Sequence, residues 1–171
     1  MASRDIDFLK RQFFKISWSA STQRNPTYQK SANPAERTRF MNEMGRYLIP
    51  IVDREYARKV SENRHYENLR ALMDFGAQAG HDILVDGFFK SANAQKLLNV
   101  YLKFFWCAGR IPCPPHCPVD AIVLRAAGIP DKKWTTLHTL DEYCLIVDRL
   151  KITAGDLSLA EWELAIYEEN A

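Results

Sequence analysis

Apolar residues recur along most of the chain with the spacing of α-helices. Between Asp5 and Ile16 they fall at every third or fourth position, which predicts a short amphipathic helix. Residues 91–108 are apolar on nearly every side, so this helix is expected at the centre of the fold. No segment alternates apolar and polar residues as a strand does. The pattern therefore predicts an all-α fold, a single domain over residues 1–171 with roughly seven or eight helices.

Turn and capping residues divide the first half of the chain. The polar stretch 17–33 predicts a loop. Asn33-Pro34 is a typical helix start, and the helix that follows is expected to be interrupted by Pro50 before it continues to about residue 60. A further helix is predicted over residues 63–79, ended by a glycine.

The later helices are marked in the same way. Pro118 is expected to open a helix that Gly128 closes. Two capping boxes, in which a hydroxyl residue is followed three positions later by a glutamate, start the last two helices at Thr139 and Ser158.

Composition and charge limit the classes of partner. The chain has 171 residues, of which 47% are apolar and 26% charged, as in ordinary globular proteins. The net charge of +2 neither requires nor excludes nucleic acid, although many basic residues lie before residue 70. DNA or a protein is therefore the expected partner. No apolar stretch is long enough to span a membrane, and four cysteines without a leader peptide favour reduced thiols in the cytoplasm.

Residues 107–125 hold an unusual concentration of chemically active side chains. Cys107, Cys113, His116 and Cys117 are all zinc-ligand types, with Cys144 as a distant further ligand. Their spacing does not match a common zinc motif, so no metal and no cofactor are expected. Cys117 beside a helix start is an alternative thiolate nucleophile, because a helix N-terminus favours the ionised thiol.

Asp120 is the single acid of this segment. Pro118-Val119-Asp120 places it in the first turn of the following helix, where the helix N-terminus stabilises and orients an ionised carboxylate. Such an acid either caps the helix or takes part in catalysis.

The segment from Pro118 to Arg125 resembles the Pro-Val-Asp-Thr-His-Val-x-Arg stretch of the helix-hairpin-helix DNA glycosylase superfamily. The upstream run from Lys96 to Leu102 is similar to that family's Lys-Thr-Ala-Asn-Val-Val-Leu run. The resemblance spans roughly residues 90–125. It implies that Asp120 activates the nucleophile and stabilises positive charge on the deoxyribose, and that Lys96 forms a Schiff base with the sugar.

The resemblance also implies where DNA is held. The family's glycine-rich hairpin binds a DNA phosphate through backbone N–H groups, and the matching stretch here begins at Lys90 and contains no glycine. Lys90, Ser91, Asn93 and Arg125 are the implied DNA contacts.

Two functions follow as alternatives. The first is a divergent glycosylase-like hydrolase acting on DNA bases, in which Lys96 and Asp120 face one open cleft. The second is a non-enzymatic helical module that binds a protein or nucleic acid and in which the cysteine- and proline-rich loop is structural. The isolated His65, His81 and His138 are interpreted as surface or capping residues, and Trp18 as a loop aromatic available either for stacking on bases or for packing on the core.

Overall fold

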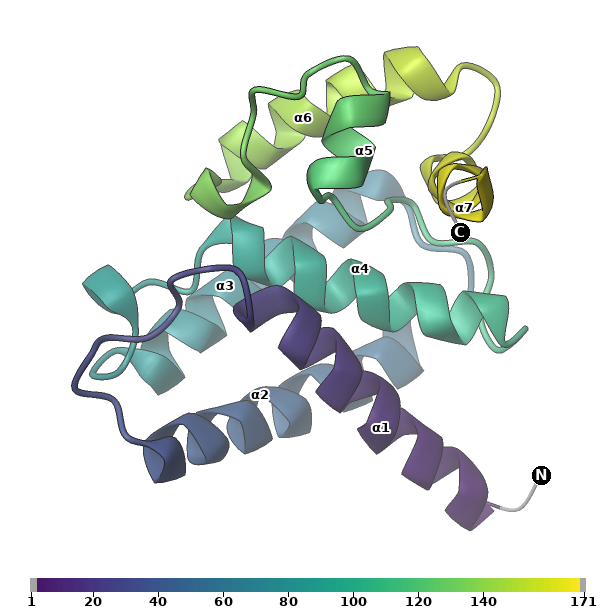
Figure 1. Ribbon diagram of the computed structural model, residues 1–171. Helices are drawn as coiled ribbons and strands as arrows, with labels where there is room; N and C mark the ends of the chain where they lie inside the picture. Colours follow the sequence, from purple (N-terminus) through teal and green to yellow (C-terminus); the bar gives the residue numbers. More distant parts are fainter. Residues whose placement is uncertain (1–2, 170–171) are drawn as a thin grey trace.

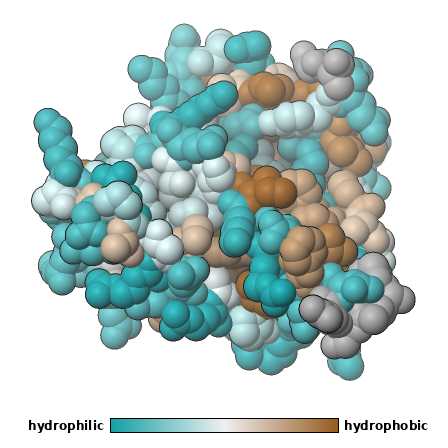
Figure 2. All heavy atoms as spheres, turned by 60° about the horizontal axis from the view of Figure 1, so that its bottom comes forward, coloured by the Kyte–Doolittle hydropathy of each residue, from teal (hydrophilic) through white to brown (hydrophobic). Residues whose placement is uncertain are grey.

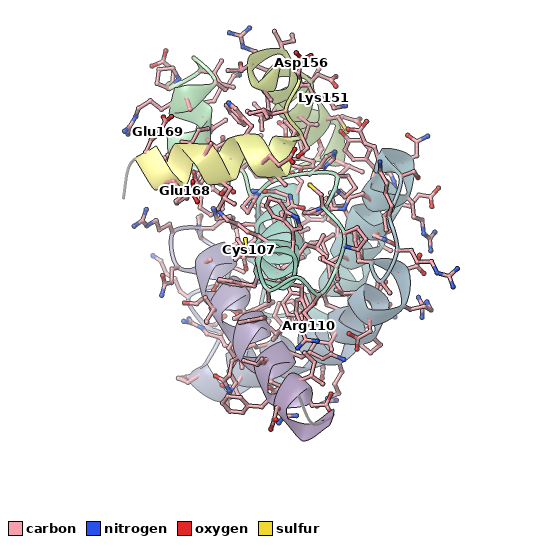
Figure 3. The ribbon with its side chains drawn as sticks, turned by 90° about the vertical axis from the view of Figure 1, so that its right-hand side faces the viewer. Cys107, Arg110, Lys151, Asp156, Glu168 and Glu169 are labelled. Atoms are coloured by element: carbon pink, nitrogen blue, oxygen red, sulfur yellow. The ribbon has the colours of Figure 1, made fainter. Side chains whose placement is uncertain are left out.

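The helix α4 (Ser91–Cys107) is the central element of the molecule. In the computed structural model, which describes residues 3–169, nearly all of its first twelve residues are buried. Helices α1 (Ser3–Thr22), α3 (Glu62–Gly80) and α6 (Leu140–Ala154) pack against it. Figure 3 looks almost along α4, with Cys107 at its near end and the other helices around it. The predicted central position of this apolar helix is confirmed.

The remaining helices form two groups around α4. Helices α1 and α2 (Pro34–Glu55) lie below it in Figure 1, with α3 behind. The short α5 (Ala121–Ala126) lies above it with α6, and α7 (Leu159–Glu169) lies beside them near the C-terminus. Two short 3-10 helices, η1 (Val85–Gly87) and η2 (Trp134–Thr136), lie in the connections. Within residues 3–169 there is no strand, so the all-α prediction is confirmed.

The predicted loop over residues 17–33 is wrong in its first part, because α1 continues to Thr22. The hydroxyl of Ser17 donates to the carbonyl of Phe13, and the hydroxyls of Ser21 and Thr22 donate to that of Trp18. These bonds satisfy hydroxyls that would otherwise compete with the helix backbone. Trp18 consequently lies on the buried face of α1, 6% exposed, and is a core residue rather than a loop aromatic.

The predicted interruption at Pro50 is also wrong, because α2 runs through it without a break. Pro50 lies on the exposed side of the helix, where water can bond the carbonyl that loses its N–H partner. The predicted start of this helix is confirmed: Asn33 and Glu36 form a capping box.

Capping side chains set the starts of the last three α-helices. The capping box of Thr139 and Glu142 starts α6, and the reciprocal bonds of Ser158 and Glu161 start α7, as predicted. The helix expected from Pro118 begins later, at Ala121, because Asp120 is its N-cap residue. In the described part of the chain, no helix is both long and apolar enough to cross a bilayer.

Candidate functional site

Side chains of α4 fix the loop that leads into α5. Gln95 bonds both backbone groups of Val119: its amide nitrogen donates to the carbonyl at 2.9 Å and its oxygen accepts the N–H at 2.9 Å. One turn further along, the Asn99 amide donates to the carbonyl of Cys117 at 3.0 Å. Because all three bonds are buried, the backbone directly before Asp120 has one position relative to α4.

The two oxygens of Asp120 have different partners. Oδ1 accepts the backbone N–H groups of Ile122 and Val123 and so caps α5. Oδ2 lies 2.8 Å from the Lys96 Nζ and also accepts the hydroxyl of Tyr167. The side chains of Lys96 and Asp120 are 9% and 15% exposed. The expectation that this amine and this acid meet, although 24 residues apart in the chain, is confirmed.

The surroundings of Asp120 act on its pKa in opposite directions. Burial raises the pKa of the carboxyl, while the neighbouring Lys96 ammonium, the Tyr167 hydroxyl and the Val123 N–H lower it. The lowering causes prevail, and the pKa of Asp120 lies below its ordinary value. The acid is therefore ionised at neutral pH and forms a true ion pair with the amine.

The ion pair lies in the wall of an open pocket. The pocket has a volume of about 340 Å³, within the range of small-molecule sites. The Trp134 ring lies 5.7 Å from the Lys96 Nζ, close enough for a cation–π contact. The lining combines the end of α1, α4, the start of α5, η2 and α7: Ala20, Gln23, Arg24, Lys96, Asp120, Ala121, Ile122, Trp134 and Tyr167.

The implied phosphate contacts at the start of α4 do not reach the surface. Lys90, Ser91 and Asn93 are all buried, and the Asn93 amide donates to the Ser21 carbonyl and the Thr27 hydroxyl. The first N–H groups of α4 donate to the carbonyls of His138 and Leu137. The helix start that holds a phosphate in the resembled family is thus occupied by this chain's own backbone, and the three predicted contacts are corrected on this ground. Arg125 is exposed on α5.

The cysteine- and proline-rich loop is packed rather than open. Within residues 3–169, no group of three or more histidine, cysteine, aspartate or glutamate side chains could hold a metal ion. Cys117 is buried, and burial raises its pKa, so the expected thiolate is wrong. The cysteine lies three residues before the Asp120 cap, too far from the helix start to be stabilised by it.

Two histidines form a buried polar cluster beside this loop. The Nδ1 of His116 lies 3.0 Å from the Tyr143 hydroxyl and its Nε2 lies 2.9 Å from a Glu62 oxygen. His65 is fully buried against His116 and bonds the Tyr56 hydroxyl at 2.8 Å. The interpretation of His65 as a surface residue is wrong. The sequence carries no local signal for this pairing, because the two rings come from segments 51 positions apart (116 − 65).

A larger groove, of about 510 Å³, lies between α1 and α2. Phe14, Met41 and Ile49 contribute to its apolar lining, and Figure 2 shows hydrophobic residues gathered among hydrophilic ones on this side of the molecule. Its ion pair, Lys10 with Asp53, leaves the acid 42% exposed. The groove is larger than the Lys96–Asp120 pocket, but its acid and amine are 42% and 20% exposed, more than the 15% and 9% of Asp120 and Lys96.

Two pocket residues were not found by sequence reasoning. Trp134 sits on a one-turn 3-10 helix, and Tyr167 lies two residues before the end of α7. Both become visible as site residues only through their contacts with Lys96 and Asp120. No family model, no curated protein and no solved structure matches this chain.

Proposed function

We propose that the chain is a glycosylase-like enzyme that acts on bases in DNA, with Lys96 and Asp120 as its catalytic pair. The observation that carries the proposal is the ion pair of 2.8 Å in the wall of an open pocket. The two residues that the resemblance assigns to catalysis come from separate elements, yet they share one pocket.

The chemistry suits the cleavage of an N-glycosidic bond. Lys96 transfers a proton to Asp120 Oδ2, and the neutral amine attacks the anomeric carbon while the bond to the base breaks. The departing base takes the electron pair of that bond and receives a proton from the Asp120 carboxyl. As Asp120 gives up that proton, its returning negative charge lies beside the positive charge that develops on the sugar, where an anion is most stabilising. Asp120 then takes a proton from the bound nitrogen and passes it to the ring oxygen as the bond between that oxygen and the anomeric carbon breaks, which yields the protonated Schiff base.

The pocket offers an aromatic surface for a base. Enzymes that act on a base in a duplex first extrude the nucleotide and stack the base on aromatic or apolar side chains. Trp134 lines the pocket beside the amine, and a volume of about 340 Å³ accommodates one nucleoside. Trp134 is itself only 7% exposed, so in this proposal it contacts the base through the part of its ring that lines the pocket.

The test is to trap the Schiff base. The native protein is incubated with DNA that contains an abasic site, whose aldehyde condenses with the Lys96 amine to an imine and water. Borohydride reduces that imine to a stable amine, so a covalent protein–DNA adduct is expected on a denaturing gel. Peptide mapping should place the DNA on Lys96. An adduct on another lysine, or none with abasic DNA, would refute the amine's role.

Four exposed cations around the pocket replace the missing hairpin as phosphate contacts in this proposal. Arg24 lines the pocket, Lys132 and Lys133 directly precede Trp134, and Arg125 lies on α5. Within residues 3–169 none of the four forms an ion pair. They are free to neutralise phosphates and to release counterions from DNA.

Replacing these four cations by alanine is expected to reduce the salt dependence of DNA binding. Each lost contact lowers the slope of log K against log salt by about 0.7 for a single strand, so the slope should fall by about 3. Fluorescence anisotropy of a labelled oligonucleotide over a salt series measures it. A charge-matched control should leave the slope nearly unchanged. It removes four exposed cations of α2, α3 and their connection: Arg39, Arg58, Lys59 and Arg70. Equal slopes for the two variants would show that nucleic acid does not bind at the four cations around the pocket.

A non-enzymatic helical module is the second candidate, and the packing of the cysteine- and proline-rich loop favours it. Pro114, His116 and Cys117 are buried, and Asp120 ties this loop to α4, α5 and α7. In that case Asp120 is only a stabilising cap. The trapping experiment separates the two, since a structural ion pair gives no adduct.

A further inference from the structure

The last helix, α7, reaches back to the candidate catalytic acid. Its Tyr167 hydroxyl donates to Asp120 Oδ2, the oxygen that also accepts from Lys96, although Tyr167 is 47 residues further along the chain. We infer that Tyr167 is a positioning residue, which holds Asp120 Oδ2 in place when the Lys96 amine leaves the ion pair to react. The inference rests on the proposed function and adds to it a residue that the resemblance does not supply.

The Tyr167 hydroxyl matters because of how the two oxygens of Asp120 are bonded. Oδ1 is committed to the backbone of α5 through two N–H groups. Oδ2 has two partners, the Lys96 amine and the Tyr167 hydroxyl. Once Lys96 bonds to a sugar carbon, its nitrogen no longer lies in the ion pair. Tyr167 is then the partner that remains to fix the direction of Oδ2.

A second ion pair keeps Tyr167 in position. Lys103 lies one heptad after Lys96 on the same side of α4, and its Nζ sits 4.4 Å from the centre of the Tyr167 ring. The same Nζ bonds a Glu163 oxygen at 2.6 Å. The Glu163 side chain is 2% exposed and lies four residues before Tyr167, hence on the same side of α7. Lys103 therefore clamps both residues of α7 against α4.

Because α7 forms part of the pocket wall, the contacts of Lys103 with Glu163 and Tyr167 also fix that wall. Figure 3 shows α7 between α5 above and α4 below, with Glu168 and Glu169 at its free end. Its contacts with α5 and α6 leave one side of the helix facing the pocket, where Tyr167 forms part of the lining.

Several charged or titratable groups face Asp120 and set its protonation. Lys96 comes from α4, Tyr167 and Glu163 from α7 and Cys117 from the preceding loop. Arg24, which follows α1 and lines the same pocket, acts on Tyr167. Donation from the Tyr167 hydroxyl lowers the pKa of Asp120, and the carboxylate in turn raises the pKa of Tyr167. Loss of the hydroxyl alone leaves the other groups in place, so its effect on the acid can be isolated.

The experiment compares Tyr167→Phe with the native protein. The variant keeps the ring over Lys103 and removes only the hydroxyl. The pKa of Asp120, followed by carboxyl ¹³C NMR during a pH titration, should rise by about one pH unit. Because the reaction uses ionised Asp120, the acidic limb of the trapping rate should move to higher pH by the same amount. At neutral pH Asp120 stays ionised, and the trapping rate should fall several-fold there because Oδ2 is no longer held in place.

Tyr47→Phe is the matched control, since it removes the half-buried hydroxyl of α2 that bonds the Ala71 carbonyl and lies outside the pocket. It should change neither the Asp120 titration nor the trapping profile. An Asp120 titration that stays in place in Tyr167→Phe overturns the inference, whatever the activity. If the pKa of Asp120 rises in Tyr167→Phe but the native protein gives no adduct, the positioning contact is supported and the proposed function is refuted. The two failures are therefore distinguishable.

Discussion

Replacing Lys96 by methionine is expected to abolish the borohydride-trapped adduct with abasic DNA. Methionine has nearly the length of the lysine stem but no amine, so the Schiff base has no nitrogen donor. The side chain is 9% exposed and its stem packs within the protein, so the apolar replacement should leave the fold intact. The adduct is measured by gel shift under denaturing conditions. Lys59→Met, which changes an exposed lysine outside the pocket, should trap as the native protein does.

Asp120→Asn is expected to slow trapping by about 10²-fold or more, the usual loss when a positioned acid or base is removed. Asparagine still caps a helix, so α5 should persist. The variant leaves the Lys96 ammonium nearly buried without its counter-charge, and the free energy of unfolding should fall by about 2–4 kcal/mol. Urea unfolding followed by circular dichroism measures this loss.

The double variant Lys96→Met/Asp120→Asn separates catalysis from stability. With both charges removed, no uncompensated ion remains, and much of the stability lost in Asp120→Asn should return. Activity should remain absent. Recovery of the adduct together with stability would show that the single variant failed through misfolding and that the pair has no chemical role.

Much of the helical framework could be predicted because its determinants are local. Asn33 with Glu36 and Thr139 with Glu142 start helices through bonds within a single turn, which a sequence displays directly. The central position of α4 follows from its continuous apolar surface. The errors at Trp18 and Pro50 have one origin: local propensity was used where burial of one helix face and exposure of the other decide the outcome.

The candidate site was predicted only as far as the resemblance reached. Lys96 and Asp120 belong to the matching segments, so their meeting could be expected. Tyr167 and Trp134 lie outside those segments, and their contribution depends on tertiary contacts that no short motif encodes. The error at Lys90, Ser91 and Asn93 arises because the carbonyls of residues 137 and 138 fold back onto the start of α4. A pairing over more than forty positions is invisible to local sequence patterns.

The chain is expected to lose stability steeply between pH 6 and pH 4. Burial and the nearby His116 hold the pKa of His65 well below its ordinary value, and burial with the Lys151 charge lowers the pKa of His116 to about 3. In this range the unfolded chain binds a proton at each ring and the folded chain does not. The two histidines together then contribute a slope of about 3 kcal/mol per pH unit.

The sign of the effect follows from these lowered values. The stabilisation is fully present above pH 6.5, the ordinary histidine value, and it is lost progressively as the pH falls towards the folded-state pKa values. Over two pH units the loss is about 5 kcal/mol, which is comparable to the whole stability of many domains. Urea unfolding at several pH values between 4 and 7 measures the slope.

His116→Gln should halve this slope, because the amide keeps polar contacts with Tyr143 and Glu62 but does not titrate. His81→Gln, which removes an exposed histidine, is the matched control and should keep the native slope. A native slope near zero would mean that the two rings are not held neutral in the folded state. His116 also anchors the loop that leads to Asp120, so protonation that breaks its bonds should free this loop.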